Sequence, residues 1–380
     1  MELKEYRFDE VTINFDKKRV PLSGAQREKR QGKYRYYGAQ GVIDHIDDFI
    51  FDGTYLLIAE DGENLKSKKQ NISQVVEGQF WVNNHAHIVQ GNELCNTHYL
   101  CYLLNSMDLS GYVTGSAQPK LSQANLNAVT LSLPSICEQK KIVEYLHILD
   151  KKISINQNIN DNLQQQAQSY FQKLFVNNAD PEWTSGTISD LGTIVGGGTP
   201  SKAKPEYYTE SGIAWITPKD LSINKSKFIS HGENDITELG LKNSSAAIMP
   251  EGTVLFSSRA PIGYIAIAAG EVTTNQGFKS VVPKPEIGTP FVYFFLKYNL
   301  PFIEGMASGS TFKEVSGSTM KNIPAIIPDV ETLARFNDFC TPIFAQQRIL
   351  EEQSQSLAAL RDNLLAKLMS GEIDVSDIQL

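Results

Sequence analysis

The pattern of hydrophobic and polar positions divides the chain into two kinds of segment. Residues 1–134 and 177–328 contain short apolar runs, such as Phe80-Trp81-Val82 and Tyr264-Ile265-Ala266-Ile267, between turn residues. Short runs of β-branched and aromatic residues bounded by turns are typical of strands. Each segment also holds one short apolar run of the helical kind, Tyr99–Asn105 and Phe291–Tyr298. We therefore predict two compact α/β domains.

Two other segments, 135–176 and 329–369, carry a helical pattern. From Ser135 to Phe175 the chain has neither Gly nor Pro, and its apolar positions recur at alternating spacings of four and three. Such a heptad repeat is the signature of a coiled coil. We predict two helices of about 60 Å each, from a rise of about 1.5 Å per residue. The first apolar seam is Ile142, Leu146, Leu149, Ile153, Leu163, Ala167, Tyr170 and Leu174, and the second is Phe336, Cys340, Ile343, Leu350, Leu357, Leu364 and Leu368.

Each long helix has an apolar stripe and therefore needs a partner. We expect the two helices to pair antiparallel, with the two halves of the chain related by a pseudo-twofold axis. The polar residues in the seams either fix the register of the pair or are solvated positions in a loose seam. Pro342 is expected to break the second helix near its start, so that the regular coiled coil begins around Ile343. The polar seam positions are Asn156, Asn160, Gln347 and Ser354.

The chain also repeats itself. A constant offset of 194 residues relates Gly115-Ser116 to Gly309-Ser310, Leu131–Pro134 to Ala325–Pro328, and Leu174-Phe175 to Leu368-Met369. Upstream the offset changes, and Gly53-Thr54 matches Gly252-Thr253. Repetition at a fixed period indicates one structural plan used twice. The predicted domains are 1–134 and 177–328, the first helix is 135–176, and the second helix with the C-terminal tail is 329–380.

Composition narrows the class of protein. The 380 residues are 41% hydrophobic and 21% charged, and no apolar run approaches the ~20 residues that a membrane helix needs. The four cysteines are scattered without a Cys-x-x-Cys pair, which suits a reducing cytoplasm. The formal net charge of −8 argues against a protein that coats nucleic acid by itself, but not against a reader with local basic patches.

Several passages resemble the specificity subunits of Type I restriction-modification systems. The likeness to their target-recognition domains lies in Tyr36–Asp44, Phe51–Gly62, Gly197–Ser201 and Ile213–Leu221. The likeness to the family's spacer helix and C-terminal end lies in Leu133–Ile142 and Lys367–Ile373. Together these passages extend over essentially the whole chain.

The resemblance implies a subunit that recognises double-stranded DNA and performs no chemistry. In that family each recognition domain reads one half of a bipartite site. The helices recruit two adenine methyltransferase subunits, and restriction subunits join them. The chain departs from the family pattern in two places. Asp329–Thr332 lacks the Glu-Gln pair at the second helix entry, and Val20–Ser23 replaces the Gly-Gly-Thr-Pro loop in the first domain.

Candidate DNA contacts begin with the segment from Asp16 to Arg35, which holds eight basic residues against two acidic ones. Its lysines are suited to phosphates, whereas Gln26, Arg27 and Tyr34 are available for base edges, since Arg pairs with guanine and Gln with adenine. The alternative is a solvated basic loop.

Three further regions are candidates. The loop Gly196–Lys204 has glycines that let backbone N–H groups approach phosphate, or it is a structural turn. The paired loops Ser116–Ser122 and Ser310–Ser316 either contact DNA or share a requirement of the fold. Arg259 follows a strand and points into a groove or pairs with a carboxylate. The predicted DNA-binding residues are Lys17, Lys18, Arg19, Gln26, Arg27, Arg30, Lys33, Tyr34, Gln118, Lys120, Thr199, Ser201, Lys202, Lys204, Lys219, Ser257, Arg259 and Lys313.

Two alternatives belong to other classes. His85 and His87 are spaced for a zinc site, with Cys95 and His98 nearby, but the spacing matches no strong zinc pattern. A metal-dependent hydrolase using His85 and His87 and a coiled-coil scaffold without a DNA role are therefore the rivals. The sequence has no Asn/Asp-Pro-Pro-Tyr/Phe motif, no glycine-rich cofactor loop after a strand and no P-loop. We expect no catalytic residue, no bound metal and no cofactor.

Overall fold

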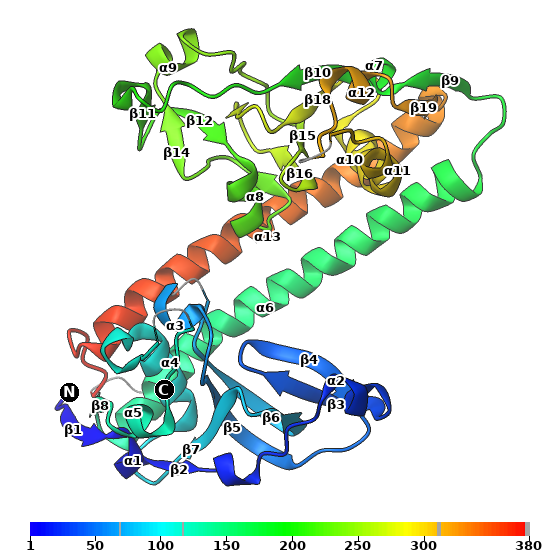
Figure 1. Cartoon of the computed structure of the whole chain (residues 1–380). Coiled ribbons are helices and arrows are strands. Elements are labelled where there is room, and N and C mark those ends of the chain that lie inside the picture. Colours follow the sequence, from blue (N-terminus) through cyan, green and yellow to red (C-terminus); the bar gives the residue numbers. More distant parts are fainter. Residues whose placement is uncertain (68–69, 116–117, 310–312, 377–380) are drawn as a thin grey trace. The chain divides into compact units, whose positions relative to one another are not determined.

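The computed structural model describes residues 1–67, 70–115, 118–309 and 313–376, and Figure 1 labels its elements. Its contacts divide the chain into two compact units. Unit 1 comprises Met1–Ile153 together with Ser356–Leu380, and unit 2 comprises Ser154–Gln355. Two long helices, α6 (Ile136–Gln172) and α13 (Val330–Met369), each contribute one end to unit 1 and the other to unit 2.

Unit 1 is built on a six-stranded sheet in which, among the described residues, β3 with β6 is the only parallel pair. A two-strand pair, β1 (Lys4–Arg7) with β8 (Thr130–Leu133), lies outside it. The order across the large sheet is β2 (Thr12–Asn14), β7 (Ala86–Gly91), β5 (Phe51–Ala59), β6 (Ser73–Val82), β3 (Gln31–Gly38) and β4 (Gly41–Ile46).

Unit 2 repeats this arrangement. Its two-strand pair is β9 (Thr184–Thr187) with β19 (Pro324–Ile327). A four-stranded sheet of β11 (Tyr208–Thr209), β14 (Asn234–Ile236), β12 (Ile213–Ile216) and β17 (Thr273–Thr274) is added. The order of the five-stranded sheet is β10 (Gly192–Gly196), β18 (Lys279–Pro283), β15 (Val254–Ser258), β16 (Ile262–Ala268) and β13 (Phe228–Ile229), and β13 with β16 is its parallel pair.

The internal repeat is therefore confirmed at the level of topology, because four strands follow in the same order and sense in both units: β2, β7, β5 and β6 in unit 1, and β10, β18, β15 and β16 in unit 2. Leu56 pairs with Val75 and Val89, and Val254 pairs with Ile267 and Val281. We align Leu56 with Val254 on this shared pairing. The match of Gly53-Thr54 to Gly252-Thr253 stays a prediction.

Short helices are also shared between the units. The predicted apolar runs form α4 (Thr97–Ser106) and α10 (Thr289–Tyr298). Asn96 caps α4 by accepting from the backbone N–H groups of His98 and Tyr99. The other short helices are α1 (Phe8–Val11), α2 (Gly24–Glu28), α3 (Asn64–Ser67), α5 (Gln123–Asn127), α7 (Ile188–Leu191), α8 (Pro218–Ile223), α9 (Glu238–Lys242), α11 (Leu300–Gly305) and α12 (Gly317–Lys321).

The long helices complete the hydrophobic core of each unit. In unit 1, Leu56 and Ile58 of the sheet pack with Leu100 of α4 and Leu146 of α6. In unit 2 the equivalent core is aromatic, and it joins sheet and α10 to the long helices. Its principal members are Phe256, Phe291, Phe294, Phe336 and Phe344, with Ala167 and Phe171 of α6. Neither sheet could bury its helix-facing side without these helices.

Within each unit the two long helices pair antiparallel. In unit 1, Arg361 Nη1 donates to Asp150 Oδ1 at 2.7 Å. In unit 2, Asn156 Nδ2 donates to Ser354 Oγ at 3.4 Å, and Gln347 Nε2 donates to the Asn160 carbonyl at 3.1 Å. The polar seam residues thus contact one another, which favours a role in register. The heptad details of the coiled coil remain a prediction.

The expected break at Pro342 was wrong. The helix α13 runs from Val330 through Pro342 without interruption. Phe336 and Cys340 before the proline and Phe344 after it are all buried in the aromatic core. Burial of this helix face outweighs the local cost of a missing backbone donor.

In the described part of the chain, no helix combines the length and the apolar character needed to span a membrane.

Candidate nucleic-acid interface

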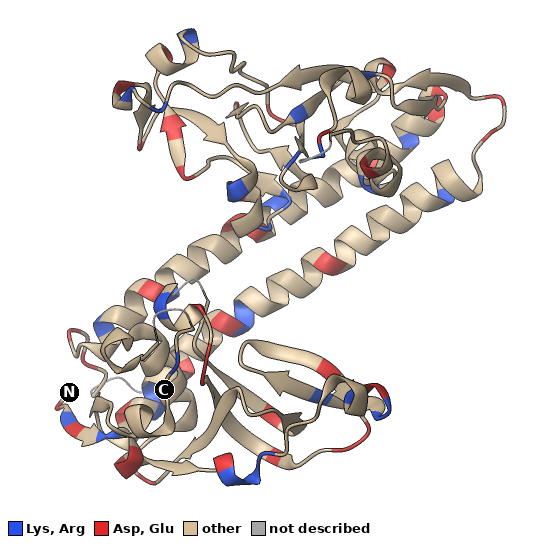
Figure 2. Ribbon diagram, viewed as in Figure 1, with Lys and Arg blue, Asp and Glu red and all other residues tan. Residues whose placement is uncertain are grey.

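The basic segment of unit 1 forms a 3-10 turn at Asp16–Lys18, the helix α2 and the strand β3. Figure 2 shows blue and red stretches interleaved around α2 and the start of β3. Ser23 and Gln26 begin α2 with a capping box, in which Gln26 Oε1 accepts from the Ser23 backbone N–H at 2.8 Å. The Gln26 side chain is exposed but already occupied as a helix cap.

Arg19 is a structural residue. Its guanidinium donates to Glu60 at 3.0 Å and to the Ala86 carbonyl at 2.9 Å, and it lies 3.4 Å from Asp16. Its side chain is 17% exposed. Burial tends to raise the pKa of Glu60, but Arg19, His87 and Lys120 outweigh burial and lower it. This ion network ties the basic segment to β7.

Arg27 and Arg30 are also paired within the unit. Arg27 Nε donates to Asp44 at 2.9 Å, and its guanidinium lies 5.2 Å from the Tyr36 ring centroid. Arg30 Nε donates to Asp47 at 2.9 Å, and its guanidinium lies 4.9 Å from the Trp81 ring. Both arginines therefore fasten the β3–β4 hairpin and its preceding helix, and a ligand would have to share them with these carboxylates.

Lys17, Lys18 and Lys33 are exposed. No ion pair joins them to a carboxylate among the described residues. Tyr34 is half-buried and packs on Phe49, with ring centroids 5.1 Å apart. Lys18 and Lys33 lie 5.2 Å and 5.0 Å from the ring centroids of Phe15 and Tyr34. These lysines therefore present positive charge that no carboxylate of the described chain neutralises.

The loop that ends at Ser122 carries Gln118 and Lys120. Gln118 is exposed, and Lys120 Nζ lies 3.2 Å from Glu60. Ser116 and Ser310, which begin the two paired loops, lie outside the described residues. In unit 2 the matching loop presents Lys313, which is exposed.

The glycine-rich loop of unit 2 lies against the polar segment that follows β17. A Cβ on Gly197 would approach the Asn275 carbonyl oxygen to 1.9 Å, and one on Gly198 would meet the Ala246 nitrogen at 2.3 Å. The Gly198 N–H already donates to Thr274 O at 2.8 Å. The glycines therefore serve close backbone packing, which supports the structural turn for this part of the loop.

The rest of this loop is more open. Thr199 Oγ1 is hydrogen-bonded to Gln276 Oε1, whereas Ser201 and Lys202 are exposed. Lys204 Nζ donates to Tyr207 Oη at 3.0 Å and lies 5.0 Å from that ring. The predicted contact residues did not include Gln276, the partner of Thr199. The polar run 273–276, which directly precedes Gly277, could have indicated it.

The remaining predicted residues of unit 2 are more constrained. Lys219 pairs with Glu233, and Arg259 Nη1 lies 3.4 Å from Glu314. Ser257 is fully buried, and its hydroxyl donates to the Pro261 carbonyl and accepts from the Tyr264 N–H, both at 2.8 Å. Ser257 therefore holds the turn after β15 and offers no group at the surface.

His85 and His87 do not form a shared metal site. His87 Nδ1 lies 2.6 Å from Asp16, and its Nε2 lies 2.8 Å from the Leu121 carbonyl, so both ring nitrogens are occupied. Burial opposes protonation of His87, but Asp16, Leu121 and Glu60 outweigh it and raise its pKa. His85 precedes β7 and contacts Asp61 at 2.7 Å. Among the described residues there is no cluster of three metal-ligating side chains.

Comparison with known proteins places this geometry in a family. The model of the Type I restriction modification DNA specificity domain matches residues 2–165 and 181–369. The Type I restriction enzyme MjaIX specificity subunit of Methanocaldococcus jannaschii is 38% identical over 48% of this chain and 44% of that protein. The HindI specificity subunit of Haemophilus influenzae is 24% identical over 85% of this chain and 84% of its own length. The match thus spans less than half of the M. jannaschii relative.

The fold comparison agrees with the topology. The crystal structure of a Type-I restriction-modification system S subunit from M. genitalium covers 97% of this chain and 96% of its own, with a TM-score of 0.64 and 15% identity. At this identity the comparison shows a shared fold, which is the two-unit α/β arrangement described above.

Proposed function

Because this chain belongs to the Type I restriction modification DNA specificity domain family, we propose that it reads a bipartite double-stranded DNA site, one half per recognition domain. The proposed recognition domains are residues 1–134 and 177–328, and the spacer helices are 135–176 and 329–380. The single observation that carries the proposal is the strand order and sense that the main sheets of the two units share. Two similar readers on one chain suit two half-sites that flank unread bases.

The proposed partners are two methyltransferase subunits and restriction subunits, as the names of the matched relatives suggest for restriction enzymes. The chain itself is proposed to be non-catalytic. That inference rests on the missing methyltransferase and nucleotide-binding motifs, and on the structural roles of His87 and Asp16. Most DNA phosphate contacts would then come from the assembled complex, in keeping with the net charge of −8.

The proposed contact residues divide by their present partners. Exposed side chains without an internal ion pair in the described chain are proposed to contact DNA directly: Lys17, Lys18, Lys33, Gln118, Ser201, Lys202 and Lys313. Paired cations are proposed to orient the surface and to share their charge with phosphate: Arg27, Arg30, Lys120, Lys204, Lys219 and Arg259.

The decisive experiment is methylome sequencing of cells that express the chain with its methyltransferase partner, compared with cells that lack the chain. We expect a methylated motif of two specified parts separated by unspecified bases. An unsplit motif would contradict the bipartite site, and the absence of chain-dependent methylation would contradict DNA recognition and favour the scaffold.

A second measurement tests the surface of unit 1. The assembled methyltransferase carrying Lys17→Ala, Lys18→Ala and Lys33→Ala should bind its site with a log K versus log salt slope smaller by about 3, because each phosphate contact contributes about 0.9 to the slope. Lys4→Ala, an exposed lysine on β1, is the matched control and should leave the slope unchanged.

A further inference from the structure

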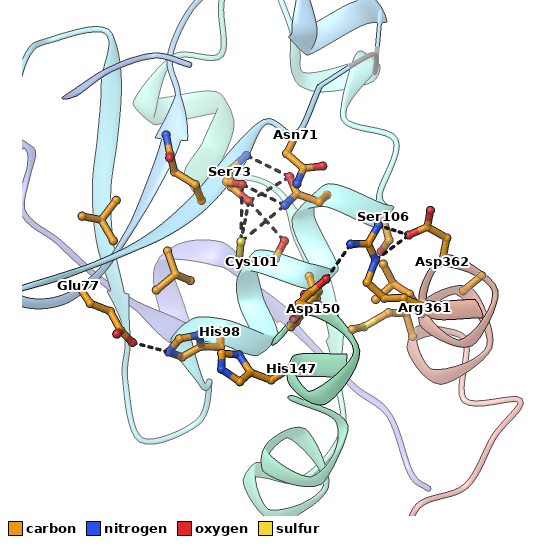
Figure 3. Close-up of a pocket in the computed structure, with 18 of the residues that line it drawn as sticks. Asn71, Ser73, Glu77, His98, Cys101, Ser106, His147, Asp150, Arg361 and Asp362 are labelled. Carbon is orange, nitrogen blue, oxygen red and sulfur yellow. Dashed lines mark hydrogen bonds and ion pairs between the residues drawn. The ribbon is translucent and has the colours of Figure 1, made fainter. Parts of the chain in front are cut away.

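Unit 1 contains an open cleft of about 1250 Å³ beside the strand β6. Its walls come from β6, α4, α6 and α13, and we call it the β6 cleft. Figure 3 shows Ser73, Glu77, His98, Cys101, Asp150 and Arg361 around it. The predicted DNA-binding residues of unit 1 do not line it. The proposed DNA contacts therefore do not account for this cleft.

One wall of the cleft is the part of the β6 edge before Phe80, with which no strand of the described chain pairs on that side. In the described part of unit 1, β3 pairs with β6 only from Phe80 to Val82. The outward backbone groups of Ser73 are met by the Asn105 side chain, which accepts from Ser73 N–H and donates to Ser73 O, both at 3.0 Å. Arg35 Nη2 donates to the Glu77 carbonyl at 2.8 Å. Side chains thus occupy positions that a further strand would take.

Unit 2 shows what can fill this place. Because Leu56 corresponds to Val254, their strand partners Val75 and Ile267 also correspond. At Ile267 and Ala268 the strand β16 pairs in parallel with β13, and Ile267 N–H donates to the Lys227 carbonyl at 2.8 Å. The chain's own segment therefore covers in unit 2 the strand edge that is open in unit 1.

The Lys227 side chain enters the space behind that edge. Its Nζ donates to Gln347 Oε1 at 2.8 Å and to Gln164 Oε1 at 3.0 Å, and it lies 3.2 Å from the Phe344 ring centroid and 4.5 Å from that of Tyr293. The residue is 8% exposed. An extended segment with a basic side chain is thus already accommodated at this position of the fold.

The residues at the same positions in unit 1 are smaller, and one of them carries a negative charge. Counting α4 and α10 from their first residues, Thr97 and Thr289, Cys101 takes the place of Tyr293. When α6 and α13 are aligned by the repeat offset of 194 residues, Asp150 corresponds to Phe344. Smaller side chains open the cleft, and a carboxylate replaces an aromatic wall.

Three carboxylates and two guanidinium groups line the cleft, so negative charge is in excess, although Arg361 pairs with both Asp150 and Asp362. Asp150 already accepts from Arg361 and from Tyr102 Oη. Glu77 and Asp362 lie at the cleft with 67% and 63% of their side chains exposed. His98 lies 3.5 Å from Glu77, but burial lowers its pKa, so at neutral pH it does not cancel that carboxylate.

We propose that the β6 cleft binds an extended segment of a partner protein, which adds a parallel strand to β6 at Val75–Glu77 and directs a Lys or Arg side chain toward the carboxylates of the cleft. Strand addition at an open edge supplies main-chain hydrogen bonds for affinity, and the cleft supplies specificity for the side chain. The occupant displaces Arg35 from the Glu77 carbonyl.

The full-length chain can be tested with a probe taken from itself. A fluorescein-labelled peptide with the sequence of residues 222–231 is titrated with the chain, and binding is followed by anisotropy. We expect saturable binding that Glu77→Lys weakens at least tenfold. Glu93→Lys, an exposed carboxylate away from the cleft, is the matched control and should bind as the parent does. A peptide carrying Lys227→Glu should also bind at least tenfold more weakly.

Hydrogen exchange locates the bound peptide. We expect protection of the backbone amides of residues 73–79, with no change at 226–229, where the chain's own strand already lies. Absence of saturable binding, equal binding by Glu77→Lys, or protection outside 73–79 would overturn the proposal. Self-association of the chain that Glu77→Lys abolishes would overturn it in favour of a second copy. None of these readouts involves DNA, so they are independent of the proposed function.

Discussion

Lys227 is buried in unit 2, although lysine is almost never fully buried unless it is paired. Burial, with the nearby positive charge of Lys297, lowers its pKa to about 6. The Glu351 carboxylate accepts from the backbone N–H groups of Lys227 and Phe228, and its negative charge acts to raise the pKa of Lys227.

This burial predicts a pH dependence of stability. Between pH 6 and the ordinary lysine pKa the unfolded chain binds a proton that the folded chain does not, so the free energy of unfolding rises with pH. The slope reaches at most about 1.4 kcal/mol per pH unit. Urea unfolding of the parent and of Lys227→Met at pH 7, 8 and 9 should show a difference in unfolding free energy that changes with pH. A constant difference would mean that the aromatic rings keep the ammonium charged.

At the scale of single residues, the sequence predicted charged and polar candidates but not the partners or the burial of their side chains. The basic segment 16–35 was recognisable as a cluster of charge, but not the carboxylates that pair with it. Asp44 reaches Arg27 only because the β3–β4 hairpin folds back, and Glu60 reaches Arg19 through a neighbouring strand. Ser257 looked like a surface residue after a strand and is buried. Such pairings depend on tertiary contacts that no local pattern encodes.

Elements were predicted better than residues. Apolar runs at 80–82, 264–267, 99–105 and 291–298 lie in β6, β16, α4 and α10. Their periodicity is a local property that survives folding. The added four-stranded sheet of unit 2 was not predicted, because its strands β11 and β17 are two residues long and carry no periodicity. The continuity of α13 through Pro342 was missed because the packing that enforces it is distant in sequence.

Pro342 offers a test of that packing at the scale of the helix. Pro342→Ala should raise the free energy of unfolding by up to about 3 kcal/mol, since it restores a backbone donor within α13. Chemical denaturation measures the change. Gln346→Ala, an exposed position one turn further, should change stability by a few tenths of a kcal/mol. A loss of stability in Pro342→Ala would mean that the proline sets a bend that the aromatic core requires.

Asn156 tests the seam between the long helices of unit 2. The residue is fully buried, and its Oδ1 has no hydrogen-bond partner within the described chain. Asn156→Leu should raise the free energy of unfolding by about 1–3 kcal/mol, because it removes an unsatisfied buried acceptor. Asn158→Leu, exposed on the same helix, should give no such gain. Equal stability of the parent and Asn156→Leu would show that the Asn156 amide stabilises the register of the two helices by about as much as its unsatisfied oxygen destabilises the fold.

At the scale of the whole molecule, the units are not consecutive halves of the chain. Unit 2 is one continuous stretch, Ser154–Gln355, that carries its own parts of both long helices. The fragment 154–355 should therefore fold alone, with cooperative unfolding and dispersed amide resonances. The fragment 177–328 lacks Phe171, Phe336 and Phe344 of the aromatic core and should be aggregated or molten. Cooperative folding of the shorter fragment would show that the helices are dispensable to unit 2.

The path of the chain through the units bears on how new variants of this protein can arise. Because both borders of unit 2 fall inside long helices, at positions 153–154 and 355–356, a double genetic crossover there transfers a complete folded body with its share of the aromatic core. A crossover at the visible edges of the globular segment would separate that core from its sheet. Recombination within the helices is therefore the route by which one unit could be exchanged while the other keeps its structure.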